Sequence, residues 1–474
     1  MYHSDYLTIR LAVTLLRESF TLLGKNAVPL SRGHLVFFID LPFFIYIALK
    51  FTPVRDWLRG IDSRIRHGVF IAAGLIIAAS YFVSAMKTPL SAQMKVHRKA
   101  DFIYTYGTLI FQVYNLFDSY NLQDHISPIG PVISGGNSDK KQSYILIQVE
   151  ALDANVINVL NRNRPITPFL RKLRNRSVCY PYTMVFHKGG GTSDAEVSII
   201  NSRETMDDQV AINLAVDYPN SVAKKLKRHN YTTYAFHGNS GQYYNRLQAF
   251  KFMGFDEFFD FYRMGLREKG WGAPDGDVFD YVLATLKKQK GPFFYYIITM
   301  SSHGPYHSVP QYYKPARPFK GVSAMERKYL TSISYVDQQL ERFVRAVRSI
   351  SDCYIIIYGD HPDLYVPAEQ QSFPRSLTLH DGIAYKFVPL YILTPDNSRY
   401  LEKRLCASFL DIAPTILQTS GCSFSIKTYG KNLLRYPLAN DTVPYMGSSF
   451  NRRELHGMIA DTARKNTKKK SGAH

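Results

Sequence analysis

The chain has 474 residues, of which 46% are hydrophobic, 20% are charged and 14% are aromatic. This composition excludes an intrinsically disordered protein, and the length predicts about two to four structural units. The formal net charge of +20 would suit a nucleic-acid-binding protein, but residues 1–100 carry +8 of it and residues 451–474 carry +5. Charge at the two ends is typical of membrane-flanking segments and solvated tails, so we expect no nucleic-acid partner. A basic protein that binds nucleic acid or another anionic polymer is the non-enzymatic alternative.

Two apolar segments near the N-terminus are predicted to span a membrane. Residues 34–51 and 68–86 each approach the length of about 20 residues that a transmembrane helix needs. The loop between them carries Arg55, Arg59, Arg64 and Arg66, which places it in the cytoplasm by the positive-inside rule. We therefore expect a multi-pass protein of the inner (cytoplasmic) cell membrane, with residues 1–90 as its membrane region and the rest outside the cytoplasm. A pair of buried core helices is the alternative.

The remaining sequence divides into a connector, an α/β domain and a tail. Residues 91–140 form the connector, which ends in a turn-rich run, SPIGPVISGGNSDKKQ. From 141 to about 440, short runs of β-branched and aromatic residues alternate with helical segments, which predicts an α/β domain with a largely parallel sheet. Residues 451–474 are predicted to be a basic, disordered tail. The four cysteines lack zinc-site spacing, so we expect Cys353 and Cys406 to be buried thiols and no disulfide framework.

The predicted strands end next to side chains that suit metal or phosphate chemistry. Four strands show this pattern: residues 143–149 before Glu150, 231–236 before His237, 292–300 before His303, and 353–359 before Asp360 and His361. In an open α/β sheet, ligands bind at the carboxyl ends of the strands, so we expect these side chains at one edge. A single histidine after a strand is usually structural, but four such ends together indicate a shared site. Carboxylates with a histidine suit Mn²⁺, Mg²⁺ or Zn²⁺, and the lack of thiolate ligands argues against structural zinc.

The segment HKGGGTSDAEVSII, residues 187–200, supplies a candidate nucleophile. Its three glycines allow the backbone to approach a ligand closely. Ser193 and Glu196 have the spacing of a capping box, which predicts a helix that begins there with Thr192 at its N-terminus, where an anion is favoured. A hydroxyl held there beside a metal can be deprotonated and attack phosphorus. The alternative is a plain glycine-rich turn before a capped helix.

The segment HGNSGQYYNR, residues 237–246, adds an arginine and two aromatic side chains near the same strand ends. Arg246 suits bidentate contact with a phosphate group, and Tyr243 and Tyr244 lie close to it in the sequence. An arginine at such a position can equally be a solvated side chain.

Together these motifs resemble the sulfatase/alkaline-phosphatase superfamily and, within it, the lipoteichoic acid synthases and related phosphoglycerol transferases. The resemblance covers residues 141–435 and follows one order: Glu150, GGGTSDAE, FHGNSGQYYNR, SSHGPY, YGDH and DIAPTIL. It implies an alkaline-phosphatase/sulfatase-like α/β fold with a central mixed, mostly parallel sheet flanked by helices and preceded by N-terminal transmembrane helices. It also implies that residues 141–440 form an extracytoplasmic catalytic domain.

The resemblance implies roles for individual residues. One divalent metal, most commonly Mn²⁺ with Mg²⁺ or Zn²⁺ as alternatives, would be bound by Glu150, Thr192, Asp360 and His361. Thr192 would also be the nucleophile and would form a phosphothreonine-type intermediate, while His303 would contact the phosphoryl group or assist proton transfer. The substrate-binding residues would be His237, Asn239, Tyr244, Arg246 and His303.

The activity implied by the resemblance is that of a membrane-anchored phosphotransferase. It would move a phosphoglycerol-type group from an anionic phospholipid donor to a glycan, lipid or polymer acceptor of the cell envelope. A phosphodiesterase or sulfatase-type hydrolase on the same scaffold is the alternative, with water as the final acceptor. Sulfate-ester hydrolysis is disfavoured, because neither Thr192 nor Cys179 lies in a C/S-x-P-x-R motif.

The sequence also departs from the family pattern. The family typically has an acidic residue where Asn239 stands and a tryptophan where Tyr244 stands, which predicts a different head-group pocket. Gly191 stands where a lysine is frequent. The membrane unit of the family usually has five spans, whereas two are evident here, which fits either a shortened form or a missing N-terminus.

Overall fold

The computed structural model describes the chain from residue 127 to residue 462, apart from short gaps at 137, 139, 188–189, 206–215, 316–317, 364, 373–375, 379–383, 400–405, 436–441, 446–447, 452 and 456. The predicted spans at 34–51 and 68–86 and residues 463–474 of the predicted tail lie outside the described residues. Within the described residues, every helix is too short or too polar to cross a membrane.

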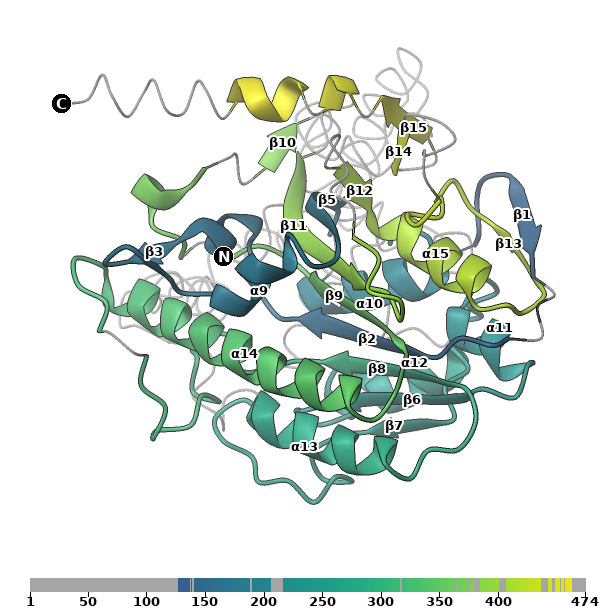
Figure 1. Ribbon diagram of the computed structural model, residues 1–474, viewed down its shortest axis with the longest axis horizontal. Helices are drawn as coiled ribbons and strands as arrows, with labels where there is room; N and C mark the ends of the chain where they lie inside the picture. The colour runs from purple at the N-terminus through teal and green to yellow at the C-terminus, as the bar shows by residue number, and fades with distance from the viewer. Residues whose placement is uncertain are drawn as a thin grey trace, which may run out of the picture. The chain divides into compact units, whose positions relative to one another are not determined.

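Nine strands of the described chain form one mixed sheet at the centre of the domain (Figure 1). They are β2 (Tyr144–Val149), β5 (Val178–Val185), β6 (Thr232–His237), β7 (Glu257–Phe259), β8 (Phe293–Ile298), β9 (Tyr354–Gly359), β10 (Ser376–Thr378), β11 (Ala384–Leu393) and β12 (Cys406–Ser408). Their order is β12-β5-β11-β9-β2-β8-β6-β7, with β10 paired to β11. Among these strands, β11 runs antiparallel to β5 and β9, while the other neighbours along the order are parallel. The prediction of a mixed, mostly parallel sheet is confirmed.

The four strands predicted to carry the site occur within two residues of their expected bounds, as β2, β6, β8 and β9. They are neighbours in the order β9-β2-β8-β6. All side chains of β2 are buried, with Leu146 in one apolar cluster and Ile145 and Ile147 in the other. A strand covered on both faces has a continuous apolar sequence, which explains why this run was recognisable.

Helices cover both faces of the sheet (Figure 1). One face packs against α9 (Pro168–Leu173), α13 (Asp275–Leu286) and α14 (Ala324–Arg348). The other packs against α10 (Gly191–Asn201), α11 (Val222–Lys227), α12 (Arg246–Phe252) and α15 (Ile412–Thr419). Short 3-10 helices lie at η2 (Ala154–Asn158), η4 (Tyr243–Asn245), η5 (Ala368–Gln370) and η6 (Phe409–Asp411), and a small hairpin joins β3 (Leu160–Asn161) to β4 (Arg164–Pro165). The result is a three-layer α/β domain.

The end of the predicted connector belongs to this domain. Strand β1 (Val132–Gly135) pairs antiparallel with β13 (Phe424–Lys427). Gly130 and Gly136 flank β1 with φ of +107° and +87°, values that favour glycine. The glycines are typical of turns, which is why the run was predicted as a turn-rich connector, although four of the five residues between them form a strand.

The predicted tail is also partly ordered. Strand β15 (Ser448–Asn451) pairs with β14 (Thr442–Tyr445), and residues 453–455 and 457–462 are helical. Leu455 and Ile459 are buried in a third apolar cluster. The prediction of disorder is therefore wrong for these helical residues. Leu455 and Ile459 stand four positions apart and lie on one face of a helix, a pattern that the surrounding positive charge obscured.

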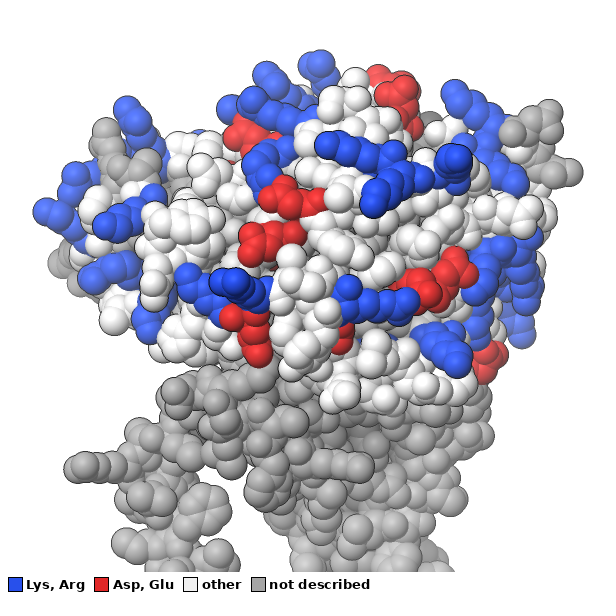
Figure 2. All heavy atoms as spheres, turned by 90° about the horizontal axis from the view of Figure 1, so that it is seen from below, with Lys and Arg blue, Asp and Glu red and all other residues white. Residues whose placement is uncertain are grey.

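All four cysteines are free and buried, which confirms the expectation for Cys353 and Cys406. On the face shown in Figure 2, lysine and arginine side chains are interspersed with aspartate and glutamate. Ion pairs of this kind join Arg263 to Glu257 and Arg345 to Glu341. Such exposed pairs contribute little stability.

Replacing Leu146 by Ala should lower the free energy of unfolding by about 2–5 kcal/mol, because this side chain is fully buried in the central strand. Ile350→Ala is the control, because Ile350 is 36% exposed after α14 and its truncation should cost much less. Urea denaturation followed by circular dichroism measures both values. Equal losses would contradict the central place of β2 in the core.

Candidate active site and metal centre

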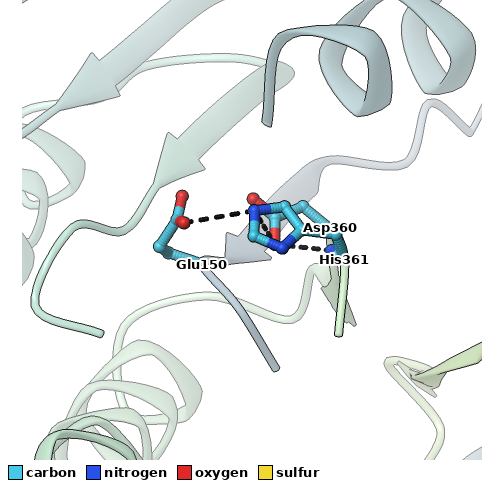
Figure 3. Close-up of side chains that lie close together, drawn as sticks. All are labelled: Glu150, Asp360 and His361. Carbon is cyan, nitrogen blue, oxygen red and sulfur yellow. Dashed lines mark hydrogen bonds and ion pairs between the residues drawn. The ribbon is translucent and has the colours of Figure 1, made fainter. Parts of the chain in front are cut away.

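Glu150, Asp360 and His361 converge at the carboxyl ends of two neighbouring strands (Figure 3). Strands β2 and β9 pair in parallel with Val149 opposite Gly359, so Glu150 and Asp360 each follow directly after a paired residue. The Asp360 backbone N–H donates to the Val149 carbonyl at 3.2 Å and extends this pairing by one residue. One potential ligand atom from each of the three side chains lies within 4.8 Å of the other two.

Hydrogen bonds fix the orientation of these side chains. Asp360 Oδ1 accepts from the backbone N–H groups of Ala151 at 2.8 Å and His361 at 2.7 Å. His361 Nδ1 donates to the Pro362 carbonyl at 3.2 Å, and Nε2 lies 3.2 Å from Glu150 Oε1. A metal-binding histidine commonly has one ring nitrogen held by a carbonyl in this way, so His361 presents Nε2 to the site.

Thr192 joins this cluster from the first turn of α10. Its hydroxyl donates to Glu150 Oε2 at 2.8 Å. Gln148 Nε2 donates to the Thr192 carbonyl at 3.1 Å and to Asp360 Oδ2 at 3.5 Å, which ties the helix to both strands. The structure thus brings together the four residues predicted as metal ligands.

Gly191 allows α10 to come this close. A Cβ atom at Gly191 would lie 2.6 Å from Cδ2 of His361, a distance that real side chains do not tolerate. The glycine run was predicted to allow close approach of the backbone to a ligand. At Gly191 the group that the backbone approaches is the His361 side chain.

The predicted capping box is not present. Helix α10 begins at Gly191, with Gly190 as its N-cap and no side-chain capping bond. The start lies before Ser193, so the expected N-cap residue is already inside the helix. Glu196, the expected partner in the box, is fully buried and binds Arg246 instead. Thr192 still lies at the helix N-terminus, as predicted.

Burial and neighbouring charges shift the pKa values of the cluster. Burial and the charge of Glu150 raise the pKa of Asp360 to about 8. Burial would lower the pKa of His361, but the charges of Asp360 and Glu150 raise it to about 10. Burial would raise the pKa of Glu150, but the charge of His303 and the contacts of His361 and Thr192 hold it well below its usual value.

These shifts share one cause, two buried carboxylates with too little positive charge around them. The raised pKa values of Asp360 and His361 are the response to this imbalance. A divalent cation would supply the positive charge, and carboxylate oxygens with an imidazole nitrogen are ligands that Mn²⁺, Mg²⁺ and Zn²⁺ accept. The donor set therefore fits a divalent metal.

His303 follows β8, and His237 is the last residue of β6, at the same edge of the sheet. His303 Nδ1 donates to the Gly304 carbonyl at 2.6 Å, and its charge acts on Glu150. His237 Nδ1 donates to the Ile298 carbonyl at 3.1 Å, and burial lowers the pKa of His237 to about 3. His237 is thus neutral near pH 7, and both histidines have one ring nitrogen held by a backbone carbonyl.

The other predicted substrate residues lie on the segment after β6. Arg246 is 2% exposed, and its Nη2 pairs with Glu196 Oε1 at 2.8 Å. The Arg246 guanidinium carbon also lies 5.6 Å from the centre of the Tyr244 ring. Asn239 is 2% exposed and accepts the Ser240 N–H at 2.7 Å. The structure therefore places Arg246 in a buried ion pair, a contact that sequence reasoning missed although Glu196 stands in the GGGTSDAE motif.

Sequence reasoning also missed a buried polar network below Thr192. The hydroxyls of Tyr296 and Tyr358 both donate to Gln148 Oε1, at 2.5 Å and 2.6 Å. Gln148 also donates to the Thr192 carbonyl, so the two tyrosines hold in place the side chain that positions the predicted nucleophile. The available signal was an amide inside the otherwise apolar strand YILIQV.

The variant Gly191→Ala should weaken metal binding on the order of 10–100-fold, because the new methyl group displaces His361. Calorimetric titration of the protein with Mn²⁺ measures the affinity. Gly457→Ala is the matched control, since a Cβ there meets no atom within 4 Å. Unchanged affinity in Gly191→Ala would contradict the contact.

Arg246→Ala should lower the free energy of unfolding by about 3–5 kcal/mol, because it leaves the Glu196 carboxylate buried without its partner. The double variant Glu196→Met/Arg246→Met removes both charges and should recover most of that loss. Urea denaturation compares the two. A double variant as unstable as Arg246→Ala would argue that the ion pair is not the cause.

Residues 142–422 match the sulfatase family model. The chain is 29% identical over 345 residues to a lipoteichoic acid synthase of Staphylococcus saprophyticus, covering 68% of this chain and 52% of that protein. It is 26% identical over 456 residues to lipoteichoic acid synthase 2 of Bacillus subtilis, covering 89% and 68%. The chain thus spans about half the length of the first of these relatives.

Solved structures show the same fold. A lipoteichoic acid synthase of Listeria monocytogenes superposes with a TM-score of 0.56 at 21% identity, covering 74% of this chain and 97% of that chain. An alkaline phosphatase superfamily protein of Vibrio parahaemolyticus superposes with a TM-score of 0.52 at 18% identity, covering 68% and 80%. With the sheet order and the family match over 142–422, these findings establish that the chain belongs to the sulfatase family.

Proposed function

We propose that the chain is a metal-dependent phosphotransferase that moves a phosphoglycerol-type group from a membrane lipid to an acceptor of the cell envelope. The observation that carries this proposal is the 2.8 Å hydrogen bond from the Thr192 hydroxyl to Glu150, inside the cluster that includes Asp360 and His361. A threonine hydroxyl in this position is suited to nucleophilic attack. The sequence similarity to lipoteichoic acid synthases favours phosphoglycerol as the transferred group.

Glu150, Asp360 and His361, with the Thr192 hydroxyl, would hold one divalent metal. We propose Mn²⁺, and Mg²⁺ or Zn²⁺ also suit oxygen and imidazole ligands. When bound, the metal lowers the pKa of the Thr192 hydroxyl and stabilises negative charge on the phosphoryl oxygens. The N-terminus of α10 adds backbone N–H groups at the same place, and these favour an anion.

In the first step, Thr192 Oγ1 attacks the phosphorus of the donor lipid. The Oγ1–P bond forms, the bond from phosphorus to the diacylglycerol oxygen breaks, and diacylglycerol leaves with the proton that the Thr192 hydroxyl gives up. Gln148 and Glu150 hold Thr192 from its carbonyl and its hydroxyl, so the nucleophile needs little reorientation.

In the second step, an acceptor hydroxyl attacks the phosphothreonine and releases Thr192. His303 serves as the base that removes the proton of the acceptor and returns it to Thr192 Oγ1 as the Oγ1–P bond breaks. The neighbouring Ser302 hydroxyl donates to the Glu150 carbonyl at 2.5 Å, which supports a location of His303 near the cluster. His237, Asn239, Tyr244 and Arg246 surround the head group in this proposal. Arg246 acts there through its ion pair with Glu196, which holds the segment after β6 against α10.

The donor in this proposal is an anionic phospholipid such as phosphatidylglycerol, and the acceptor is a glycan, a lipid or a growing polymer. The proposal places the domain outside the cytoplasm, anchored through residues 34–51 and 68–86. Support comes from the apolar sequence of those segments and the arginine-rich loop between them.

Thr192→Ala should reduce transfer on the order of 10³-fold or more, because it removes the hydroxyl that forms the intermediate. The assay follows diacylglycerol release from phosphatidylglycerol vesicles with Mn²⁺ present. Thr192→Ser keeps a hydroxyl and should retain more activity than Thr192→Ala. Full activity in Thr192→Ala would refute the proposed mechanism.

Two controls sharpen this assay. Chelation with EDTA should abolish activity, and Mn²⁺ should restore it, if the cluster holds the metal. The fate of the glycerophosphate distinguishes the two chemistries. Labelled product bound to an added acceptor indicates transfer, whereas free glycerophosphate indicates the hydrolase alternative.

A further inference from the structure

Trp271 lies near two loops of the candidate site: the loop after β6, which follows His237, and the loop after β8, which carries His303. The segment after Trp271 is held against the loop after β6, because the Ala273 N–H donates to the Gly238 carbonyl at 2.7 Å. A Cβ at Gly272 would lie 2.4 Å from the Gly238 carbonyl oxygen and 3.2 Å from Cγ of Met300. The backbone next to Trp271 is therefore packed tightly against both loops.

A second set of contacts fixes this segment to the loop after β8. Asp275, at the start of α13, accepts the backbone N–H of Met300 at 2.6 Å and of Ser301 at 3.1 Å. The Asp275 N–H donates in turn to the Ser301 hydroxyl at 2.9 Å. Since His303 follows two residues later, the position of Trp271 relative to His303 is set by buried hydrogen bonds.

The Trp271 ring belongs to a row of aromatic side chains. Its centre lies 4.9 Å from the His303 ring and 5.7 Å from the Tyr243 ring. Tyr243 lies 4.2 Å from Tyr244, whose ring is in turn 5.6 Å from the Arg246 guanidinium carbon. The row connects His303 with the residues proposed to surround the head group. Tyr243 and Tyr244 are half-buried, so part of this aromatic surface is accessible.

The indole N–H of Trp271 is an unusual feature of this row. Trp271 is 5% exposed, and its Nε1 is buried without a hydrogen-bond partner among the described residues. Buried donors in native proteins are nearly always paired, and the indole nitrogen can only donate. An acceptor oxygen of a bound ligand would give the indole N–H a hydrogen-bond partner.

We propose that Trp271 is a substrate-binding residue that receives the glycerol phosphate head group. In this inference, which rests on the proposed function, the indole N–H donates to a phosphate or hydroxyl oxygen of the head group. The carbon atoms of the glyceryl unit pack against the indole and tyrosine rings. A small polyol phosphate fits this combination, because it offers acceptor oxygens and C–H groups together.

The tryptophan content of the chain allows a direct test. The chain has two tryptophans, Trp57 and Trp271, so in the full-length variant Trp57→Phe all tryptophan emission comes from Trp271. Titration of this variant with glycerol phosphate in the presence of Mg²⁺ should give a saturable change in emission. A titration without any change in a protein that transfers phosphoglycerol would overturn the inference.

Trp271→Phe provides the second test, because it keeps a ring and removes the N–H. It should raise KM for the lipid donor roughly 10-fold, the order expected for a lost hydrogen bond to a charged acceptor, with a smaller change in kcat. Tyr262→Phe is the matched control, since it removes one polar group from a ring that is 69% exposed, and it should leave both constants unchanged.

The outcomes separate this inference from the proposed function. Active Trp271→Phe protein with an unchanged KM would overturn the role of Trp271 and leave the transferase proposal intact. A wild-type protein that neither transfers phosphoglycerol nor binds glycerol phosphate would overturn both. If Trp271→Phe does not fold, as judged by its thermal unfolding, the fluorescence titration still decides the question, because it uses the native indole.

Discussion

The parallel pairing of β2 with β9 is the constraint on which the site depends. Val149 and Gly359 lie opposite each other, so the next residue on each strand delivers a carboxylate to the same place. Both strands are buried on their two faces, and successive side chains of a strand point to opposite faces. A shift of the pairing by one residue would therefore turn core side chains outward and separate the carboxylates. The same strand register therefore determines both the burial of the core side chains and the geometry of the site.

The second element of the site is a helix that approaches these strands from outside the sheet. Thr192 must reach Glu150, and the way is open because Gly191 lacks a side chain next to His361. Beneath the helix, Gln148 and two tyrosine hydroxyls form a fully buried network that cannot rearrange without losing hydrogen bonds. Such a network is suited to holding a reacting group still, which is what a nucleophile requires.

The sequence was informative where one local pattern decides the outcome. Continuous apolar runs such as YILIQV and YIIIYG give buried parallel strands, and the polar residue that ends each run marks the edge where ligands bind. The pair of Glu196 and Arg246 could not be predicted in this way, because its members stand 50 residues apart on different elements. The prediction that α10 begins with a capping box at Ser193 was wrong for the same reason. The spacing of Ser193 and Glu196 allows a cap, but the contact of Glu196 with Arg246 depends on the tertiary structure.

The four enclosed cysteines have a consequence for the surroundings in which the domain can operate. Burial raises the pKa of Cys179 to about 12 and that of Cys353 to about 11, so hardly any thiolate exists at neutral pH. Thiolate is the form that oxidants and disulfide exchange attack. The domain holds together through packing and hydrogen bonds, with none of these sulfurs in a crosslink. Oxidants should therefore react slowly with Cys179 and Cys353 at neutral pH, and the packing around these two side chains should be insensitive to ambient redox potential.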